Sequence, residues 1–369
     1  MNPYDLHVES QTHRGDSLLL LHGVVLSIVG LGLVYSASSA RGMAHYANEA
    51  YFFKRQLLWT AMGIAVFFMA ARISLGRLRH HVFMLSVLGV ILLGLVLLFG
   101  PSINGAQRWL RVGSLQLQPS EGIKLLTVLY LAHYVTKRDV SRDAGLKVLL
   151  FPLAFVGLEI LFLMAEPDMG TSVVLFFVLL LMLFLAGASL SHLLLLGGVF
   201  AGLVVAAVLA APYRINRLLS FLDPWAYAEG SGYQLIQSLI ALGEGGPFGV
   251  GAGEGMQKML FLPESHTDFI FAILGEEFGL LGTLGVLALF ASLGMRGWRI
   301  ARTQTEPFLQ MLGIGITLLM MLQTLIHIGV TTAMLPTKGL SLPFVSYGGS
   351  SLVVNWMALG LLWNISRQA

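Results

Sequence analysis

Residues 171–211, TSVVLFFVLLLMLFLAGASLSHLLLLGGVFAGLVVAAVLAA, contain two long apolar runs and no Asp, Glu, Lys or Arg. A helix needs about 20 mostly apolar residues to cross a bilayer. The short break between the two runs lets this stretch cross twice, as spans 170–188 and 191–211. It therefore predicts an integral membrane protein whose consecutive helices return across the bilayer.

The whole chain has the composition of a polytopic membrane protein. Hydrophobic residues make up 56% of the 369 and charged residues only 11%, whereas soluble domains carry about 25% charged residues. The fold class predicted is all-α, in a single membrane domain over 1–369 with a long outer loop at 212–267. The first apolar segment has no small-residue cleavage site before YSASSARG, so we interpret it as a retained span. The same length criterion gives ten spans: 17–37, 53–71, 81–99, 118–135, 147–164, 170–188, 191–211, 268–293, 308–330 and 351–366.

Charge and cysteine content limit the orientation and the function. With both termini in the cytoplasm, the short inner loops carry most of the clustered Lys and Arg, which satisfies the positive-inside rule. The net charge of +3 is small and its basic residues are scattered, so no nucleic-acid partner is expected. The chain has no Cys, which excludes disulfides, thiolate nucleophiles and Cys-based metal sites.

The densest polar cluster, ESHTD at 264–268, directly precedes the eighth span. Asp268 has two interpretations: a carboxylate stabilised in the first turn of a helix, with Ser265 as a cap, or a partly desolvated general base. His266 and Glu264 either tune this carboxylate or bind substrate. Glu276 and Glu277 lie deeper on the same helix, where charges need partners, so we interpret them as structural.

The outer ends of other spans supply further candidates. Glu121 and Lys124 stand three residues apart in QPSEGIK and form either an intrahelical ion pair or a site for an anionic headgroup. Arg108, beside the interfacial Trp109, is either a phosphate ligand or a solvated loop charge. Asp168 in EPDMGTS is expected to cap the sixth span, and these acids offer only a weak metal-binding pattern.

The segment MLPTKGLSLPFVSYGGSS, at 334–351, interrupts apolar chain with prolines and glycines. Irregular backbone at membrane depth must be covered by protein or line a watery cavity, so this segment is expected to fold back into an outer cavity. Lys338 is its only charge. Such a cavity suits a substrate with an apolar tail in the bilayer and an anionic, sugar-sized head.

These motifs resemble the SEDS family of bacterial cell-wall proteins over nearly the whole chain. The resemblance is carried by YSASS (35–39), YFFKRQLLW (51–59), NGAQRWL (104–110), QPSE (118–121), EPDMGTS (166–172), GYQLIQSLIALGEGG (232–246), QKMLFLPESHTDFIFAILGEEFG (257–279) and LPTKGLSLPFVSYGGSS (335–351). Within the family, the motifs are more similar to the division member than to the elongation member.

The resemblance implies a peptidoglycan glycosyltransferase in the bacterial cytoplasmic (inner) membrane, with its active site on the extracytoplasmic side. It implies lipid II as substrate, a class B penicillin-binding protein transpeptidase and other division proteins as partners, and Mg²⁺ or Mn²⁺ as cofactor. Asp268 matches the catalytic aspartate of the family, and Glu121 and Lys124 match its cavity acid and lysine. Arg108 and Lys338 also fall in family motifs, and with the lysine they are expected to stabilise a departing pyrophosphate.

Three alternatives stay open from the sequence. The same activity in cell elongation differs only in its cellular role. A lipid II flippase would need a polar route that continues to the cytoplasmic side, and spans five to seven are nearly uncharged there. A non-catalytic division scaffold would leave Asp268 as a helix cap.

Overall fold

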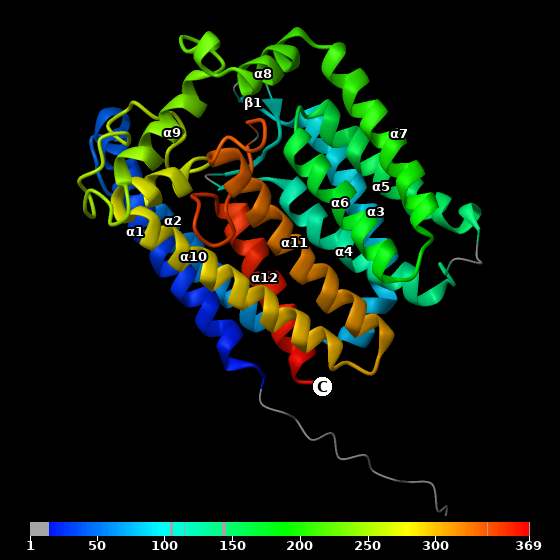
Figure 1. The fold of residues 1–369 in the computed structure, drawn as a ribbon. Coiled ribbons are helices and arrows are strands. Elements are labelled where there is room, and N and C mark those ends of the chain that lie inside the picture. The colour runs from blue at the N-terminus through cyan, green and yellow to red at the C-terminus, as the bar shows by residue number, and fades with distance from the viewer. Residues whose placement is uncertain (1–14, 104–105, 114, 142–144, 338, 369) are drawn as a thin grey trace, which may run out of the picture.

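A computed structural model describes residues 15–103, 106–113, 115–141, 145–337 and 339–368, and its ribbon is a bundle of long helices (Figure 1). Short hairpins and two smaller helices lie at the upper end of this view. The long helices are α1 (Ser17–Tyr46), α2 (Tyr51–Ala70), α3 (Leu75–Phe99), α4 (Pro119–Lys137), α5 (Leu146–Ala165), α6 (Met169–Leu185), α7 (Leu190–Leu209), α10 (Ile270–Arg302), α11 (Pro307–Thr331) and α12 (Gly349–Ser366). The smaller elements are β1 (Ser102–Ile103), β2 (Ala106–Gln107), β3 (Leu110–Val112), β4 (Leu115–Leu117), α8 (Pro212–Leu222), η2 (Trp225–Tyr227) and α9 (Tyr233–Gly245).

The predicted fold class, an all-α membrane protein, is confirmed. In the described part of the chain, α1, α3, α5, α7, α10 and α11 are long and apolar enough to cross a membrane, and α6 is a shorter apolar helix. The helices α2, α4 and α12 coincide with the other three predicted spans. They do not meet the same length and hydropathy test, so the number ten stays a prediction.

Several boundaries differ from those expected: α3 begins at Leu75 instead of 81, and α10 ends at Arg302 instead of 293. The helix α1 continues past residue 37 to Tyr46, because the small polar residues that looked like a span end face protein: Ser38 is fully buried and donates to the Val34 carbonyl at 2.6 Å. The segment 212–267, expected only as a loop, contains α8 and α9.

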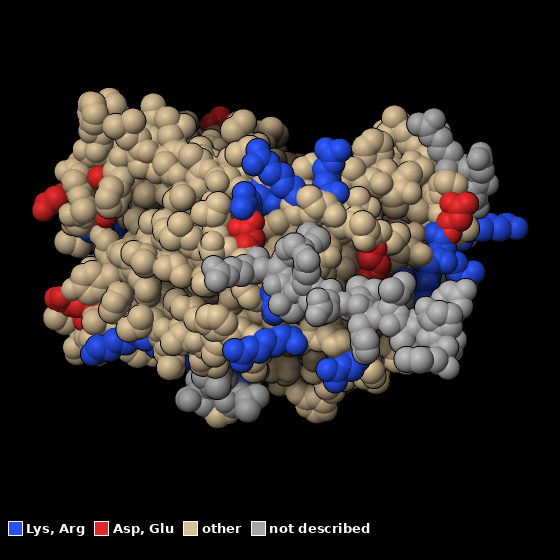
Figure 2. Space-filling model, turned by 90° about the horizontal axis from the view of Figure 1, so that it is seen from below, with Lys and Arg blue, Asp and Glu red and all other residues tan. Residues whose placement is uncertain are grey.

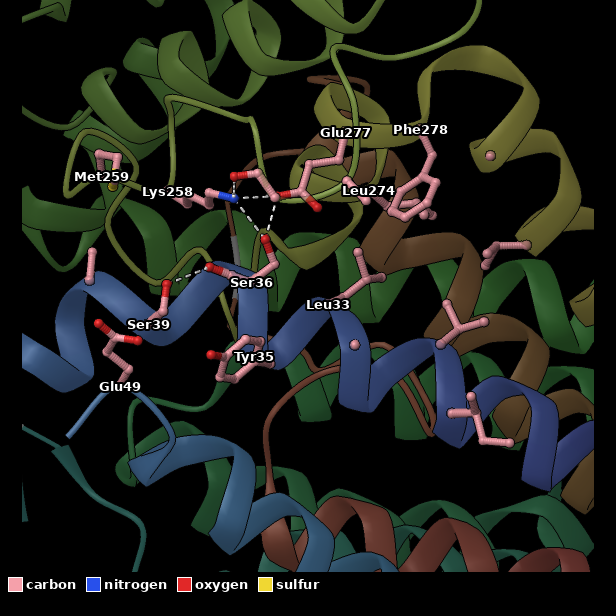
Figure 3. Close-up of a pocket in the computed structure, with 18 of the residues that line it drawn as sticks. Leu33, Tyr35, Ser36, Ser39, Glu49, Lys258, Met259, Leu274, Glu277 and Phe278 are labelled. Carbon is pink, nitrogen blue, oxygen red and sulfur yellow. Dashed lines mark hydrogen bonds and ion pairs between the residues drawn. The ribbon is translucent and has the colours of Figure 1, made fainter.

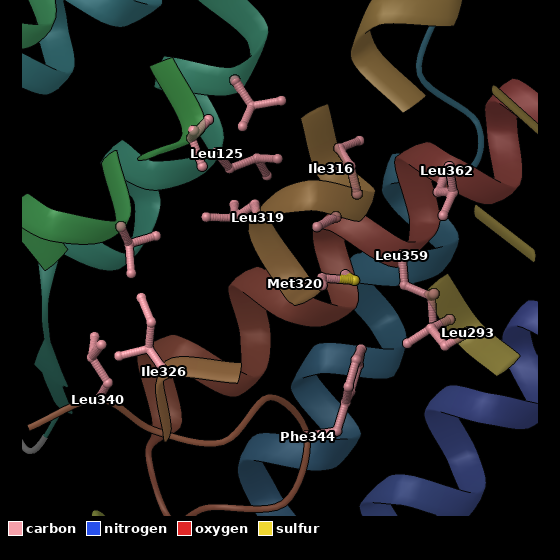
Figure 4. Close-up of a cluster of buried hydrophobic side chains, with 14 of the residues drawn as sticks. Leu125, Leu293, Ile316, Leu319, Met320, Ile326, Leu340, Phe344, Leu359 and Leu362 are labelled. Atoms are coloured by element: carbon pink, nitrogen blue, oxygen red, sulfur yellow. The ribbon is translucent and has the colours of Figure 1, made fainter. Parts of the chain in front are cut away.

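The helix α11 is the centre of the bundle. Most of its residues are buried, and it packs against α10, α4, α6 and α12. A helix that is apolar on all sides is stable in such a position because every face meets another helix. Figure 4 shows Ile316, Leu319 and Met320 of α11 between Leu125 of α4 and Leu359 of α12.

The helix α10 is interrupted, and neighbouring backbone fills the interruption. Gly279 has φ 63° and ψ −161°, which is not helical and which glycine adopts without a side-chain clash. The segment 245–251 enters this break: the amide of Val250 donates to the Glu276 carbonyl at 2.9 Å, and Leu280 donates to the Gly246 carbonyl at 2.9 Å. Backbone groups that the break frees are thereby satisfied.

The lower end of the bundle carries the basic helix ends. The turn between α2 and α3, the C-terminus of α4 and the C-terminus of α10 lie at this end, as does the C-terminus of the chain, and basic side chains are scattered over the face (Figure 2). Arg79 at the start of α3 pairs with Glu306 before α11 at 2.7 Å. This is the face that the positive-inside rule predicts to be cytoplasmic.

The contact between α2 and α12 yields a stability prediction. A Cβ on Gly360 would lie 2.5 Å from the Phe67 carbonyl oxygen, and backbone cannot move aside as a side chain can. We expect Gly360→Ala to destabilise the protein by about 1–3 kcal/mol through overpacking, seen as a lower Tm in detergent. Gly202→Ala on α7, where an added Cβ meets nothing within 4 Å, is the matched control. Equal Tm values for both variants would contradict the tight packing.

Candidate active site

A polar cavity of about 530 Å³ lies at the upper end of the bundle. Its wall comes from α2, the β2–β3 connection, the start of α4, α8, and the irregular segments before α10 and α12. Its charged lining residues are Arg55, Arg108, Glu121, Arg217, Glu264 and Asp268. Segments far apart in the sequence therefore bring acids and cations to one place.

Asp268 is not the cap of α10. The helix begins at Ile270, its N-cap is Phe269, and no side chain caps it, while Ser265 donates to the Ala37 carbonyl at 3.0 Å. The Asp268 carboxylate accepts no hydrogen bond from any residue that the structure describes. An added Cβ on Gly339 would lie 3.1 Å from Oδ2, so this glycine packs directly against the carboxylate.

The surroundings of Asp268 raise its pKa into the neutral range. Burial raises the pKa of Asp268 to about 7, and the negative charge of Glu264 acts in the same direction. The positive charges of Arg108 and Arg217 partly oppose this rise. A carboxylate with a pKa near the working pH, free of hydrogen bonds and facing a cavity is suited to general-base catalysis.

Glu264 and His266 occupy different positions. Glu264 lines the cavity, and its carboxylate accepts from Arg41 at 3.3 Å and from Thr267 at 3.1 Å. His266 does not line the cavity. It is buried, with its ring 4.8 Å from Phe52 and 5.5 Å from Tyr347 between centroids. Burial lowers the pKa of His266 to about 4, so the neutral imidazole packs behind Tyr347, which does line the cavity.

Glu121 forms the floor of the cavity and is ion-paired with Lys124, which is buried beneath it. Lys124 Nζ lies 2.8 Å from Glu121 Oε2 and donates to Gln323 Oε1 at 3.0 Å. Gln323 in turn donates to the Ser341 carbonyl at 2.9 Å. Lys124 is only 1% exposed, so Glu121 faces the cavity and the lysine holds it from below.

Arg108 is held by backbone. Its guanidinium donates to the Glu166 carbonyl at 3.0 Å and to the Pro167 carbonyl, which ties the β2–β3 connection to the turn before α6.

Asp168 caps α6 as expected, accepting from the Thr171 amide at 3.1 Å. The Glu166 carboxyl has no hydrogen-bond partner among the described residues, and burial raises its pKa to about 8, which favours the protonated form at neutral pH. Lys338 lies outside the described residues.

The cavity also contains residues that the sequence did not single out. Arg217 comes from α8, Arg55 from α2, Ser341 from the segment before α12, and Ser350 and Ser351 from the first turn of α12. The available signal for Arg217 was the spacing of PYRINRLLSFL, in which Arg214 and Arg217 fall on one helical face.

Glu276 and Glu277 are structural, away from this cavity. Figure 3 shows Glu277 with Lys258 and Ser36 at one end of a separate pocket of about 890 Å³ between α1 and α10. Lys258 Nζ lies 2.8 Å from both Glu277 Oε1 and Ser36 Oγ. Glu276 accepts from the Gln257 amide at 3.0 Å. Both acids therefore anchor the segment 253–258 that leads toward Asp268.

The described side chains do not form a resident metal site. Among them, no three His, Asp or Glu gather as a ligand cluster. Glu264 is engaged by Arg41 and Thr267, and Glu121 by Lys124. Mg²⁺ is often held by one or two carboxylates together with substrate phosphates, so Mg²⁺ or Mn²⁺ stays a prediction that depends on the substrate for further ligands.

Comparisons with known proteins agree with this architecture. The family model described as "Cell cycle protein" (FTSW_RODA_SPOVE) matches residues 16–369. The chain is 40% identical over 358 residues to the probable peptidoglycan glycosyltransferase FtsW of Coxiella burnetii, covering 96% of each protein. It resembles a chain from "Structural coordination of polymerization and crosslinking by a peptidoglycan synthase complex", with a TM-score of 0.81 and 28% identity over 96% of this chain and 98% of that one. The Thermus thermophilus rod shape determining protein RodA gives a TM-score of 0.71 and 27% identity, over 96% and 97%.

The floor of the cavity yields a prediction on stability. Removing one partner of a buried ion pair leaves an uncompensated charge and costs about 3–5 kcal/mol. We expect Lys124→Met to lower Tm strongly, and the double variant Glu121→Gln with Lys124→Met to recover part of the loss. Thermal unfolding of the two single variants and the double variant measures this coupling. Strictly additive losses would show that the two side chains do not act as a pair.

Proposed function

Because the chain belongs to the FTSW_RODA_SPOVE family, we propose that it is a peptidoglycan glycosyltransferase that polymerises lipid II during bacterial division. The observation that carries the proposal is Asp268: a carboxylate with no hydrogen-bond partner among the described residues, in a polar cavity at one end of a bundle of apolar helices. A substrate with a polyprenyl tail and a sugar head would place its reacting groups at this level.

The reaction joins two lipid-linked sugars. Asp268 takes the proton of the 4-hydroxyl of the acceptor GlcNAc, and the oxygen attacks the anomeric carbon of the donor MurNAc from the face opposite the pyrophosphate. The bond to the pyrophosphate oxygen breaks, and its electron pair leaves with undecaprenyl pyrophosphate. The α-linked donor is thus inverted to a β-1,4 link. A positioned general base typically contributes ~10²- to 10⁴-fold in rate.

The other charged residues take supporting roles. Glu121 presents a carboxylate at the cavity floor, and Lys124 orients it through the 2.8 Å ion pair, because the lysine itself is buried. Arg108 keeps its positive charge beside the cavity, where it would favour the developing negative charge of the leaving group. No step is assigned to a metal ion.

The cellular setting follows from the relatives. The chain is 40% identical to an FtsW and 27% identical to RodA, which favours division over elongation. The synthase complex supports a class B penicillin-binding protein transpeptidase as partner. We place the cavity on the extracytoplasmic side of the cytoplasmic membrane, opposite the basic face. Glu121 lines the cavity and its partner Lys124 is buried beneath it, an arrangement that favours polymerisation over passage of a headgroup.

The central test replaces the base. Asp268→Asn keeps the shape of the side chain but cannot accept the hydroxyl proton, so we expect correct insertion and no glycan strands from purified lipid II. The assay contains the cognate transpeptidase and Mg²⁺, and Glu229→Gln, an exposed acid outside the cavity, is the control. Polymerisation by Asp268→Asn at the wild-type rate would remove Asp268 from the mechanism.

The pH dependence gives a second test. Asp268 must be deprotonated to act as a base, so kcat/KM should fall as the pH drops through about 7, the raised pKa of this carboxyl. Because the charge of Glu264 helps raise that pKa, Glu264→Gln should move the inflection to lower pH, whereas Glu229→Gln should not. An inflection that stays in place in Glu264→Gln would show that another group titrates.

A further inference from the structure

A smaller cavity of about 330 Å³ opens beside the polar cavity that contains Asp268, which we call the catalytic cavity. We name it the arginine crevice, after Arg108, Arg214 and Arg217, which line it. It shares Arg108, Arg217 and Gly339 with the catalytic cavity. Since Gly339 packs against the Asp268 carboxylate, the crevice reaches the neighbourhood of the proposed base.

On its other side, the crevice continues into an apolar groove of about 890 Å³ between α5, α6 and α7. The two share Met169, Val204 and Arg214. The groove is lined by side chains such as Leu158, Leu161, Phe176 and Leu203, and these helices are apolar. A hydrocarbon chain fits this groove, and a polar group at its end would lie in the crevice.

The three arginines differ in their engagement. Arg108 donates to the carbonyls of Glu166 and Pro167. Arg214 donates to the Ala207 carbonyl at 2.8 Å and has a further partner. Arg217 is exposed, and its guanidinium makes no hydrogen bond or ion pair with any residue that the structure describes. Its guanidinium is therefore the one available to a ligand without breaking an existing contact.

The helix α8 places Arg217 at the crevice. Leu218, Leu219 and Leu222 are 42%, 40% and 70% exposed, while the arginines at 214 and 217 line the crevice. A short helix with exposed leucines and inward-facing arginines is typical of one that lies along the membrane interface. In Figure 1, α8 lies across the upper end of the bundle, next to the upper end of α7. Among the described residues, Asp168 is the one acid that lines the crevice, and Thr171 already donates to it twice.

We propose that Arg217 binds the pyrophosphate of the lipid-linked donor in the arginine crevice, with the polyprenyl chain in the α5–α7 groove. A guanidinium recognises phosphate oxygens through paired, charge-assisted hydrogen bonds. This position holds the leaving group on one side of Asp268 and leaves the rest of the cavity for the acceptor. The identity of the donor rests on the proposed function, whereas the site for a polyprenyl pyrophosphate rests on the crevice itself.

The test is direct binding of undecaprenyl pyrophosphate to the purified full chain in detergent micelles. We expect Arg217→Gln to weaken binding at least about tenfold, as loss of a charged hydrogen bond does, and Arg217→Lys to restore part of it. Arg111→Gln removes an equal charge from an exposed position outside the three cavities and should bind as wild type does. Undecaprenol, which lacks phosphate, should bind all four proteins equally.

Three results would overturn the inference: equal affinity of Arg217→Gln and wild type, an equal loss of affinity for undecaprenol, or displacement of undecaprenyl pyrophosphate by equimolar phosphatidylglycerol. The last would identify the site as one for bulk anionic lipid.

In polymerisation assays, Arg217→Gln should raise KM for lipid II more than it lowers kcat. Wild-type polymerisation, measured in the same preparation, distinguishes the two proposals. If undecaprenyl pyrophosphate binds through Arg217 but no glycan strands form, the proposed function is wrong and the crevice site stands. If strands form but Arg217→Gln binds undecaprenyl pyrophosphate as wild type does, only the crevice site is wrong.

Discussion

Backbone hydrogen bonding at membrane depth is the constraint on which the site depends. Irregular chain is tolerated there only if its N–H and C=O groups find partners in the protein. The break of α10 at Gly279 and the incoming segment 245–251 satisfy each other, and Glu276 accepts the amides of Met256 and Gln257. The chain can then run irregularly from α9 to Asp268 while staying fixed on a membrane helix.

The charged groups near Asp268 and α10 are of two kinds: some are paired within the protein and others are not. Glu121 with Lys124, Glu277 with Lys258, and Arg108 with two carbonyls are satisfied within the protein, so they hold segments together. Asp268 and Arg217 have no such partner among the described residues. An unpartnered charge beside a low-dielectric wall interacts strongly with whatever enters, because little water competes for it. Acidic and basic side chains thus stabilise the fold in one case and serve as binding or catalytic groups in the other.

The sequence predicts the membrane helices well because twenty apolar residues have few other stable arrangements in lipid. It predicts less where the chain is irregular. Helical spacing allowed an ion pair between Glu121 and Lys124, but no local pattern could pair Glu277 with Lys258 or place His266 behind Tyr347, because those contacts join segments across the fold. The sequence did not single out Arg217, because it lies on α8, within the segment 212–267 that was predicted to be a loop. The polar cluster at 264–268 made Asp268 a candidate base or helix cap, and the resemblance matched it to the catalytic aspartate of the family. Its neutral-range pKa follows only from the burial that the fold creates.

The pocket between α1 and α10 bears on inhibition. Gly32 and Gly285 border it, and an added Cβ at either meets nothing within 4 Å, so it has room beside two apolar helices. Its polar end is the Lys258–Glu277–Ser36 cluster, which anchors the segment that carries the chain toward Asp268. A lipid-soluble compound that entered from the bilayer and separated Lys258 from Glu277 would loosen the segment 253–258 that leads toward Asp268, without resembling a sugar or a phosphate. Resistance to such a compound would arise in α1 and α10, away from the residues that contact substrate.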